Sequence, residues 1–200
     1  MNIYLASNNK GKIKEISHYF PNSKVLSESD IEKILNTKID IIEDGKTFEE
    51  NAKIKVEYIA NLLKDTMEHD DIVVADDSGI LIPSLPDLLG VYTKRQMKKW
   101  CDENKKTEQD FYNYISSICP MPNTCIFKVV IAVFQNGISK TYTDSLKGTL
   151  AKSCRGENGF GFDPIFEIEN KTLAEMTNEE KAIINPRIKA MDHMKNDILK

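Results

Sequence analysis

The sequence predicts a mixed α/β fold, because short runs of strand-forming residues alternate with segments that have the apolar spacing of helices. The chain opens on such a run, residues 2–7. Asn136-Gly137 stands between two apolar runs, which is a strong signal for a β-hairpin. Helix starts are predicted at Thr47, Thr107 and Thr177, since an acidic side chain follows each threonine three residues later.

In the first part of the chain, residues 2–7 are expected to form a strand and the residues after it a helix. Residues 39–42 are interpreted as a second short strand. Thr47 is expected to cap a helix of about four turns, because apolar residues recur after it at intervals of four, three and four. These residues are Ala52, Val56, Ile59 and Leu63.

In the second part, residues 72–75 form an apolar run that two aspartates are expected to stop, and residues 80–82 resume it. No element is predicted for the polar stretch 94–107. A helix is expected over 107–118, followed by hairpin strands at 125–134 and 138–150. Asn185-Pro186 is typical of a cap followed by the first residue of a helix. We expect a single domain over residues 1–200.

Composition excludes several classes of protein. The chain has 40% hydrophobic residues and no apolar run of about eighteen, so no membrane span is predicted. A net charge of −4 argues against nucleic-acid binding, which needs a concentrated basic face. The N-terminus lacks the pattern of a secretory signal, and the four cysteines lack zinc-site spacing. A cytoplasmic protein with reduced thiols is expected.

Two groups of residues are candidates for phosphate contacts. Ser7, Asn9 and Lys12 lie in a glycine-bearing turn between the first strand and the first helix, where free backbone N–H groups bind anions. The alternative is a capped helix with solvated lysines. Glu43 and Lys55 are weaker candidates, because an isolated glutamate or helical lysine is usually solvated.

Asp76, Asp77 and Ser78 follow a buried apolar run, and adjacent carboxylates there lose hydration unless a cation or hydrogen-bond donors compensate. Mg²⁺ prefers such hard oxygen ligands. The alternative is a turn whose side chains cap their own backbone.

The segment 156–166 interleaves glycines with aromatic residues and contains Phe160, Phe162 and Asp163. Aromatic faces near a surface suit stacking on a nucleobase, whereas buried ones would pack against the sheet. Lys181 and Arg187 follow and could donate to a purine edge.

The order of these segments resembles the inosine triphosphate pyrophosphatase family over residues 3–191. The family's opening Ser/Thr-x-Asn-x-x-Lys corresponds to Ser7, Asn9 and Lys12, and Glu43 precedes the Gly-x-Thr-Phe helix start. The other matching motifs are Glu-Asn-Ala at 50–52, Ala-Asp-Asp-Ser-Gly at 75–79, Gly-Phe-Gly-aromatic-Asp-Pro-x-Phe at 159–166 and Ala-Glu-Met-x-x-x-Glu-Lys at 174–181.

The resemblance implies an elongated mixed sheet flanked by helices, two lobes enclosing a nucleotide cleft, and a homodimer. It implies hydrolysis of ITP, dITP and XTP to the monophosphate and pyrophosphate. Glu43, Asp76 and Asp77 would hold Mg²⁺, with Asp77 or Asp76 activating water, and Lys12 and Lys55 would neutralise phosphate charge. Substrate contacts would come from Ser7, Asn9, Lys12, Ser78, Phe160, Phe162, Asp163, Lys181 and Arg187.

Two departures from the family pattern concern specificity. Asn185-Pro186-Arg187 stands where the family has Ser-His-Arg, so one side-chain donor to the base is lost. Residues 86–90 replace a Gly-Gly-x-Pro-Gly segment. Two alternatives therefore stay open: the same chemistry with relaxed or shifted base specificity, and a nucleotide-binding protein without turnover.

Overall fold

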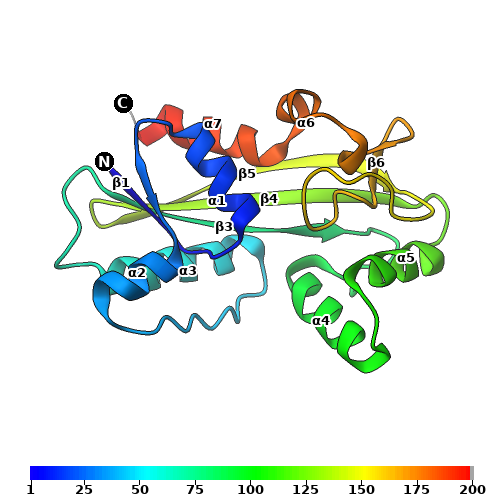
Figure 1. Cartoon of the computed structure of the whole chain (residues 1–200), viewed down its shortest axis with the longest axis horizontal. Coiled ribbons are helices and arrows are strands. Elements are labelled where there is room, and N and C mark those ends of the chain that lie inside the picture. Colours follow the sequence, from blue (N-terminus) through cyan, green and yellow to red (C-terminus); the bar gives the residue numbers. More distant parts are fainter. Residues whose placement is uncertain (199–200) are drawn as a thin grey trace. The chain divides into compact units, whose positions relative to one another are not determined.

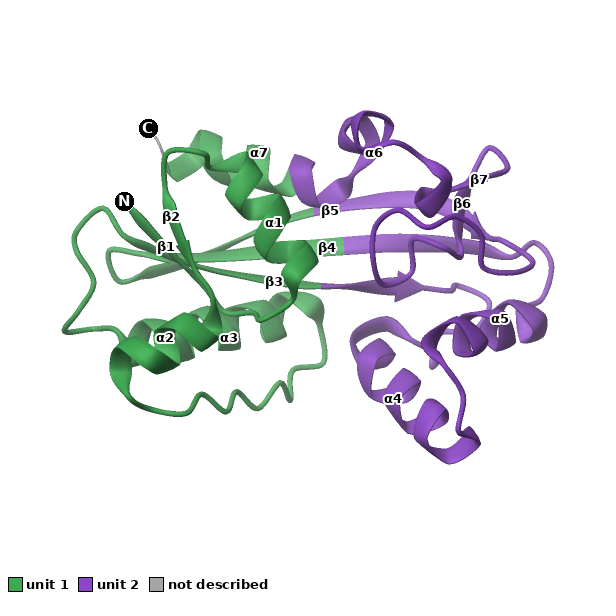
Figure 2. Ribbon diagram, in the orientation of Figure 1, with its two compact units in different colours: residues 1–77, 129–143, 190–200 green, residues 78–128, 144–189 purple. Residues whose placement is uncertain are grey.

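The computed structural model describes residues 1–198, which form two compact units with a mixed α/β architecture (Figures 1 and 2). Unit 1 comprises residues 1–77, 129–143 and 190–200, of which 199–200 lie outside the described part, and unit 2 comprises 78–128 and 144–189. The strands form one seven-stranded sheet in the order β2-β1-β3-β4-β5-β6-β7. The predicted α/β class is confirmed, and no helix among residues 1–198 is long and apolar enough to cross a membrane.

Unit 1 is built on parallel strands. Strand β1 pairs in parallel with β2 on one side and with β3 on the other. Helices α1 and α7 lie on one side of these strands, and α2 and α3 lie on the other (Figure 2). The elements that contribute are β1 (Asn2–Leu5), α1 (Lys10–Tyr19), β2 (Lys24–Leu26), α2 (Glu28–Leu35), α3 (Phe48–Leu62), the first part of β3 (Ile72–Leu81), and parts of β4 (Thr124–Gln135), β5 (Ile138–Leu150) and α7 (Pro186–Ile198).

Unit 2 holds the remaining parts of these strands together with two short antiparallel strands. Strand β6 pairs with β5 and with β7. An aromatic cluster fills its core, in which Phe162 packs edge-on against Tyr112 and Phe127. The elements that lie wholly in unit 2 are the 3-10 turn η1 (Gly90–Tyr92), α4 (Thr93–Asn104), α5 (Glu108–Ile118), β6 (Phe166–Ile168), β7 (Lys171–Thr172), the 3-10 turn η2 (Leu173–Glu175) and α6 (Asn178–Ile184).

The predicted caps and hairpin are confirmed. Thr47, Thr107 and Thr177 each accept a hydrogen bond from the third residue of their helix, which returns one to the cap. Asn136 and Gly137 both have positive φ, 49° and 79°, as a tight β-hairpin turn with the twist of its strands requires. Local sequence signals of this kind act over a few residues, which is why they predict structure well.

Three sequence predictions need correction. Residues 39–42 form no strand: Ile39 is buried, its amide donates to Glu32, and Ile42 is 73% exposed. The aspartates do not stop β3, which runs on through them to Leu81. The polar stretch 94–107 contains most of helix α4, where Trp100 stacks on a tyrosine of α5 while most other side chains of the helix are exposed.

The altered loop at 86–90 is closed by one side chain of α4. Leu89 has φ 70°, a conformation that favours glycine, and its side chain is buried. Gln96 accepts a hydrogen bond from the Leu89 amide at 2.7 Å and donates one to the Asp87 carbonyl at 3.1 Å. These two bonds stabilise a positive-φ backbone conformation at Leu89, which glycine adopts more readily than leucine does.

A buried carboxylate joins the start of β1 to the turn before β3. Asp71 accepts hydrogen bonds from the amide of Asn2 at 2.6 Å, from its side-chain amide at 3.1 Å and from the amide of Glu68 at 3.2 Å. Burial acts to raise the pKa of Asp71, but the bonds from Asn2 and Glu68 outweigh it and hold the pKa below its usual value. The ionised form therefore stabilises the fold.

We expect Asp71→Asn to lower the free energy of unfolding by about 2 kcal/mol at pH 7, the scale of hydrogen bonds to a charged group. Because the folded pKa is depressed, this contribution is present above the unfolded pKa and is lost as pH falls through the folded pKa. Urea unfolding of both proteins between pH 7 and pH 3 measures the difference. A difference that stayed constant over this range would contradict the role of the charge.

Candidate active site

The turn after β1 is capped by its own side chains. Asn9 caps helix α1, and its Oδ1 accepts hydrogen bonds from the amides of Gly11 at 2.9 Å and Lys12 at 3.2 Å. Ser7 Oγ accepts from the Asn9 amide at 3.1 Å. The turn thus holds the amide groups of a helix N-terminus in place, and an anion there would replace Asn9 as their acceptor.

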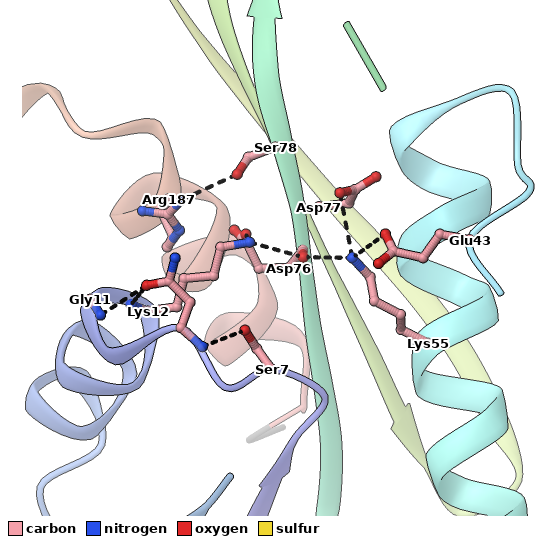
Figure 3. Close-up of polar contacts among 10 residues, drawn as sticks. Ser7, Gly11, Lys12, Glu43, Lys55, Asp76, Asp77, Ser78 and Arg187 are labelled. Atoms are coloured by element: carbon pink, nitrogen blue, oxygen red, sulfur yellow. Dashed lines mark hydrogen bonds and ion pairs between the residues drawn. The ribbon is translucent and has the colours of Figure 1, made fainter. Parts of the chain in front are cut away.

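Asp76 and Asp77 lie on opposite sides of strand β3, because consecutive strand residues alternate between faces. Figure 3 shows Lys12 approaching from one side and Lys55 from the other. Asp76 is 1% exposed and forms an ion pair with Lys12. Asp77 forms its ion pair with Lys55, at 3.4 Å. The alternation explains how two adjacent acids are accommodated: each has its own lysine.

The end of strand β1 explains why both lysines reach this point. The carbonyl of Val74 accepts a hydrogen bond from the amide of Ala6, where β1 ends. The carbonyl of Asp76, two residues on, points to the same side, where β1 no longer offers a donor. Lys12 Nζ donates to it at 3.2 Å and Lys55 Nζ at 3.0 Å.

Lys55 also holds Glu43. Its Nζ lies 3.0 Å from Glu43 Oε2, and the side chain is 8% exposed although helical lysines are usually solvated. Burial acts to lower the pKa of Lys55, but the negative charges of Asp77 and Glu43 outweigh it and raise that pKa. Lys55 is therefore a buried ammonium group bound between two carboxylates.

Asp77 has an incompletely satisfied carboxylate. Its Oδ1 faces Lys55, whereas its Oδ2 is buried and receives no hydrogen bond from any residue within 1–198. Burial raises the pKa of Asp77, and Lys55 opposes this shift. A buried carboxylate oxygen without a partner is costly, so a donor or a cation at this position would stabilise it.

The predicted metal ligands suit a divalent cation in kind but are not gathered around one point. Among residues 1–198, no group of three or more His, Cys, Asp or Glu side chains could hold a metal ion. Glu43 and Asp77 both form ion pairs with Lys55, whereas Asp76 forms its ion pair with Lys12. The hard oxygen donors and the unpartnered Asp77 Oδ2 nevertheless fit a hard cation.

In unit 2, Ser78 and Phe160 orient Arg187. The guanidinium of Arg187 is buried, donates to Ser78 Oγ at 3.3 Å and lies 5.5 Å from the centre of the Phe160 ring. Asn185 Oδ1 accepts from the Arg187 amide at 2.9 Å, so this asparagine caps α7 as predicted, and Pro186 is buried as its first residue. Where the family pattern has a histidine, the chain therefore has a helix start without a side-chain donor.

Asp163 and Lys181 form an ion pair in unit 2, at 3.1 Å. Burial raises the pKa of Asp163, and Lys181 opposes the shift. Gly159 passes so close that an added Cβ would lie 1.8 Å from Asp163 Oδ2, which explains the glycine at this point. Phe162 belongs instead to the aromatic cluster of the unit 2 core, as the alternative interpretation of this segment expected.

Parallel strand β1 ends beside the carboxylates and lysines of the cluster around Asp76 and Asp77. The chain therefore has the features of an α/β protein that binds phosphate groups and hard cations. The model of the Ham1 family matches residues 3–197, and the chain belongs to this family. The predicted resemblance is thereby confirmed.

Relatives and solved structures in this family match the whole chain. The dITP/XTP pyrophosphatase of Thermoanaerobacter pseudethanolicus is 37% identical over 205 residues, covering 100% of this chain and 98% of the relative. That of Staphylococcus epidermidis is 35% identical, covering 92% and 90%. Among solved structures, a HAM1 protein from Coxiella burnetii has a TM-score of 0.78 at 28% identity, covering 98% and 97%. The Ham1 protein of Staphylococcus aureus has a TM-score of 0.70 at 29% identity, with the same coverage.

Sequence reasoning missed the residues that support the site rather than form it. Asn51 is 1% exposed and binds the loop that carries Glu43, and Gly45 and Gly159 allow close backbone approaches. The signal in the sequence was that each residue falls inside a motif of the family pattern: Gly45 in Gly-x-Thr-Phe, Asn51 in Glu-Asn-Ala, and Gly159 in the motif at 159–166.

We expect Lys55→Met to lower the free energy of unfolding at pH 7 by about 3 kcal/mol, because it leaves the largely buried carboxylate of Asp77 without its cation. Urea unfolding measures the loss. Lys53→Met on the same helix is the control, since Lys53 is exposed. Equal stability of the two variants would contradict the role of the Lys55 ammonium.

Proposed function

We propose that this protein hydrolyses the purine nucleoside triphosphates ITP, dITP and XTP to the monophosphate and pyrophosphate, and so removes non-standard purines from the nucleotide pool. The observation that carries the proposal is the cluster beside the end of β1, where Lys12 and Lys55 pair with Asp76 and Asp77 of β3 and with Glu43. Full-length similarity to proteins named dITP/XTP pyrophosphatase supports the substrate class.

The charge of the cluster favours a divalent cation. Three carboxylates face two ammonium groups, which leaves an excess of negative charge that would repel a polyphosphate. We propose that Glu43, Asp76 and Asp77 hold Mg²⁺. Held by these carboxylates, the cation would supply Lewis-acid stabilisation of the negative charge on the leaving pyrophosphate.

The chain's own residues would perform the rest of the reaction. Lys55 fixes Oδ1 of Asp77 and leaves Oδ2 to accept the proton of the attacking water, and burial keeps the pKa of Asp77 raised toward that of a working base. Lys12 and Lys55 would neutralise the phosphates, with Ser7 and Asn9 at the N-terminus of α1 as further contacts. No covalent intermediate on the protein is needed.

Base recognition is proposed to lie in unit 2. Arg187 is held by Ser78 and Phe160, and Lys181 is held by Asp163, so two cations have fixed orientations before a base arrives. Phe160 offers its ring for stacking, whereas Phe162 packs against Tyr112 and Phe127. The cytoplasmic location and the homodimer that the resemblance implies stay predictions.

A second candidate keeps the chemistry and relaxes the choice of base. Pro186 is buried at the start of α7 and offers no donor, and Asn185 uses its side-chain oxygen to cap that helix. Loss of one donor from a site built for it reduces discrimination by about 1–3 kcal/mol. The same hydrolysis with a broader set of bases would follow.

We expect Asp77→Asn to reduce pyrophosphate release from dITP in the presence of Mg²⁺ by at least about 10³-fold, because the amide cannot accept the proton from water. Circular dichroism checks that the variant folds. Asp70→Asn makes the same chemical change at an exposed position and should leave the rate unchanged. Wild-type turnover by Asp77→Asn would refute the assigned role of Asp77.

A further inference from the structure

The loop that carries Glu43 has no secondary structure, yet Glu43 must be held at a defined place to face Lys55. Its side chain is 43% exposed, so burial does not fix it. The position of the Glu43 carboxylate therefore depends on what holds the backbone of residues 43–47.

The start of helix α3 holds this backbone. Asn51 Oδ1 accepts a hydrogen bond from the Gly45 amide at 2.9 Å. Glu50 Oε2 accepts from the amides of Lys46 at 2.6 Å and Thr47 at 3.1 Å. Three successive amides of the loop thus donate to two side chains of one helix, and of these two side chains Asn51 is buried whereas Glu50 is exposed.

The spacing of loop and helix matches. Asn51 and Lys55 are four residues apart and lie on one face of α3, separated by about 6 Å along its axis. Gly45 and Glu43 are two residues apart, which an extended chain spans in about 7 Å. The loop therefore runs along the helix with Gly45 opposite Asn51 and Glu43 opposite Lys55.

Gly45 is needed for this contact. An added Cβ would lie 2.6 Å from Asn51 Oδ1 and 2.8 Å from Glu50 Cβ, closer than real Cβ atoms approach such neighbours. The loop backbone thus rests directly on the helix, and a methyl group at this point would push it away.

We propose that Asn51 is a positioning residue that sets the Glu43 carboxylate for cation binding. The proposal rests on the proposed function in taking Glu43 as a ligand of the divalent cation. Asn51 acts only through the loop: it fixes Gly45, and Gly45 fixes how far Glu43 reaches along α3.

The test measures Mn²⁺ binding to the full, nucleotide-free chain. The electron paramagnetic resonance signal of free Mn²⁺ reports how much of the ion is bound. We expect Asn51→Ala to raise the dissociation constant about tenfold, the lower end of the effect of losing a support for a metal ligand. Gly45→Ala should also raise the dissociation constant for Mn²⁺, because it disturbs the same contact from the loop. This variant tests the proposal if Asn51→Ala does not fold. Asn51→Asp keeps an acceptor of the same shape and should restore most of the affinity.

A double-mutant cycle separates positioning from general destabilisation. If Asn51 acts through Glu43, Asn51→Ala should have no further effect on Mn²⁺ affinity in a Glu43→Gln background. Thr107→Ala removes the cap of α5, far along the chain, and should leave the affinity unchanged. Hydrogen exchange should accelerate at residues 43–47 in Asn51→Ala.

Three results would each overturn the proposal. The first is unchanged Mn²⁺ affinity in both Asn51→Ala and Gly45→Ala, and the second is an effect of Asn51→Ala that adds to that of Glu43→Gln. The third is no Mn²⁺ binding by the wild-type chain. Pyrophosphate release is assayed separately. A chain that binds Mn²⁺ in the expected order but releases no pyrophosphate would refute the proposed function and leave the role of Asn51 intact.

Discussion

The ammonium group of Lys55 is the interaction on which the candidate site depends. It is buried among Glu43, Asp77 and the carbonyl of Asp76, and so connects a loop, a helix and a strand of unit 1 at one point. Burying one charge is costly unless partners surround it, and here two carboxylates outweigh that cost and keep the lysine charged. The same contacts leave one oxygen of Asp77 without a hydrogen-bond partner among residues 1–198, which is where a cation or a water molecule would be stabilised.

The termination of β1 creates this point. Because β3 continues beyond its parallel neighbour, the Asp76 carbonyl is left for side chains to satisfy, and the alternation of strand residues directs Asp76 and Asp77 to different lysines. Ser78, the next residue of β3, contacts Arg187 of unit 2.

Sequence patterns predicted the features that depend on neighbouring residues, such as the threonine caps, the Asn-Gly turn and the site motifs. They failed where distant contacts decide. Residues 39–42 look like a strand, but no strand in the described part of the chain pairs with them, and Ile39 is buried by other contacts. Helix α4 is polar apart from a short apolar stripe, and its Trp100 stacks against a tyrosine of α5. The burial of Lys55 and the support from Asn51 could not be predicted either, since nothing in their spacing shows what the loop at 43–47 does.

The cluster around Lys55 is proposed to hydrolyse deaminated purine triphosphates. The most direct measurement is the rate of pyrophosphate release with Mg²⁺ from ITP, dITP, XTP, GTP, ATP and dUTP at equal concentrations. We expect pyrophosphate release from ITP, dITP and XTP at rates at least about tenfold above those from GTP, ATP and dUTP. This ratio corresponds to about 1.4 kcal/mol of discrimination. No release from any of the six would contradict this proposal, and equal release from all six would favour the broader specificity that Pro186 suggests.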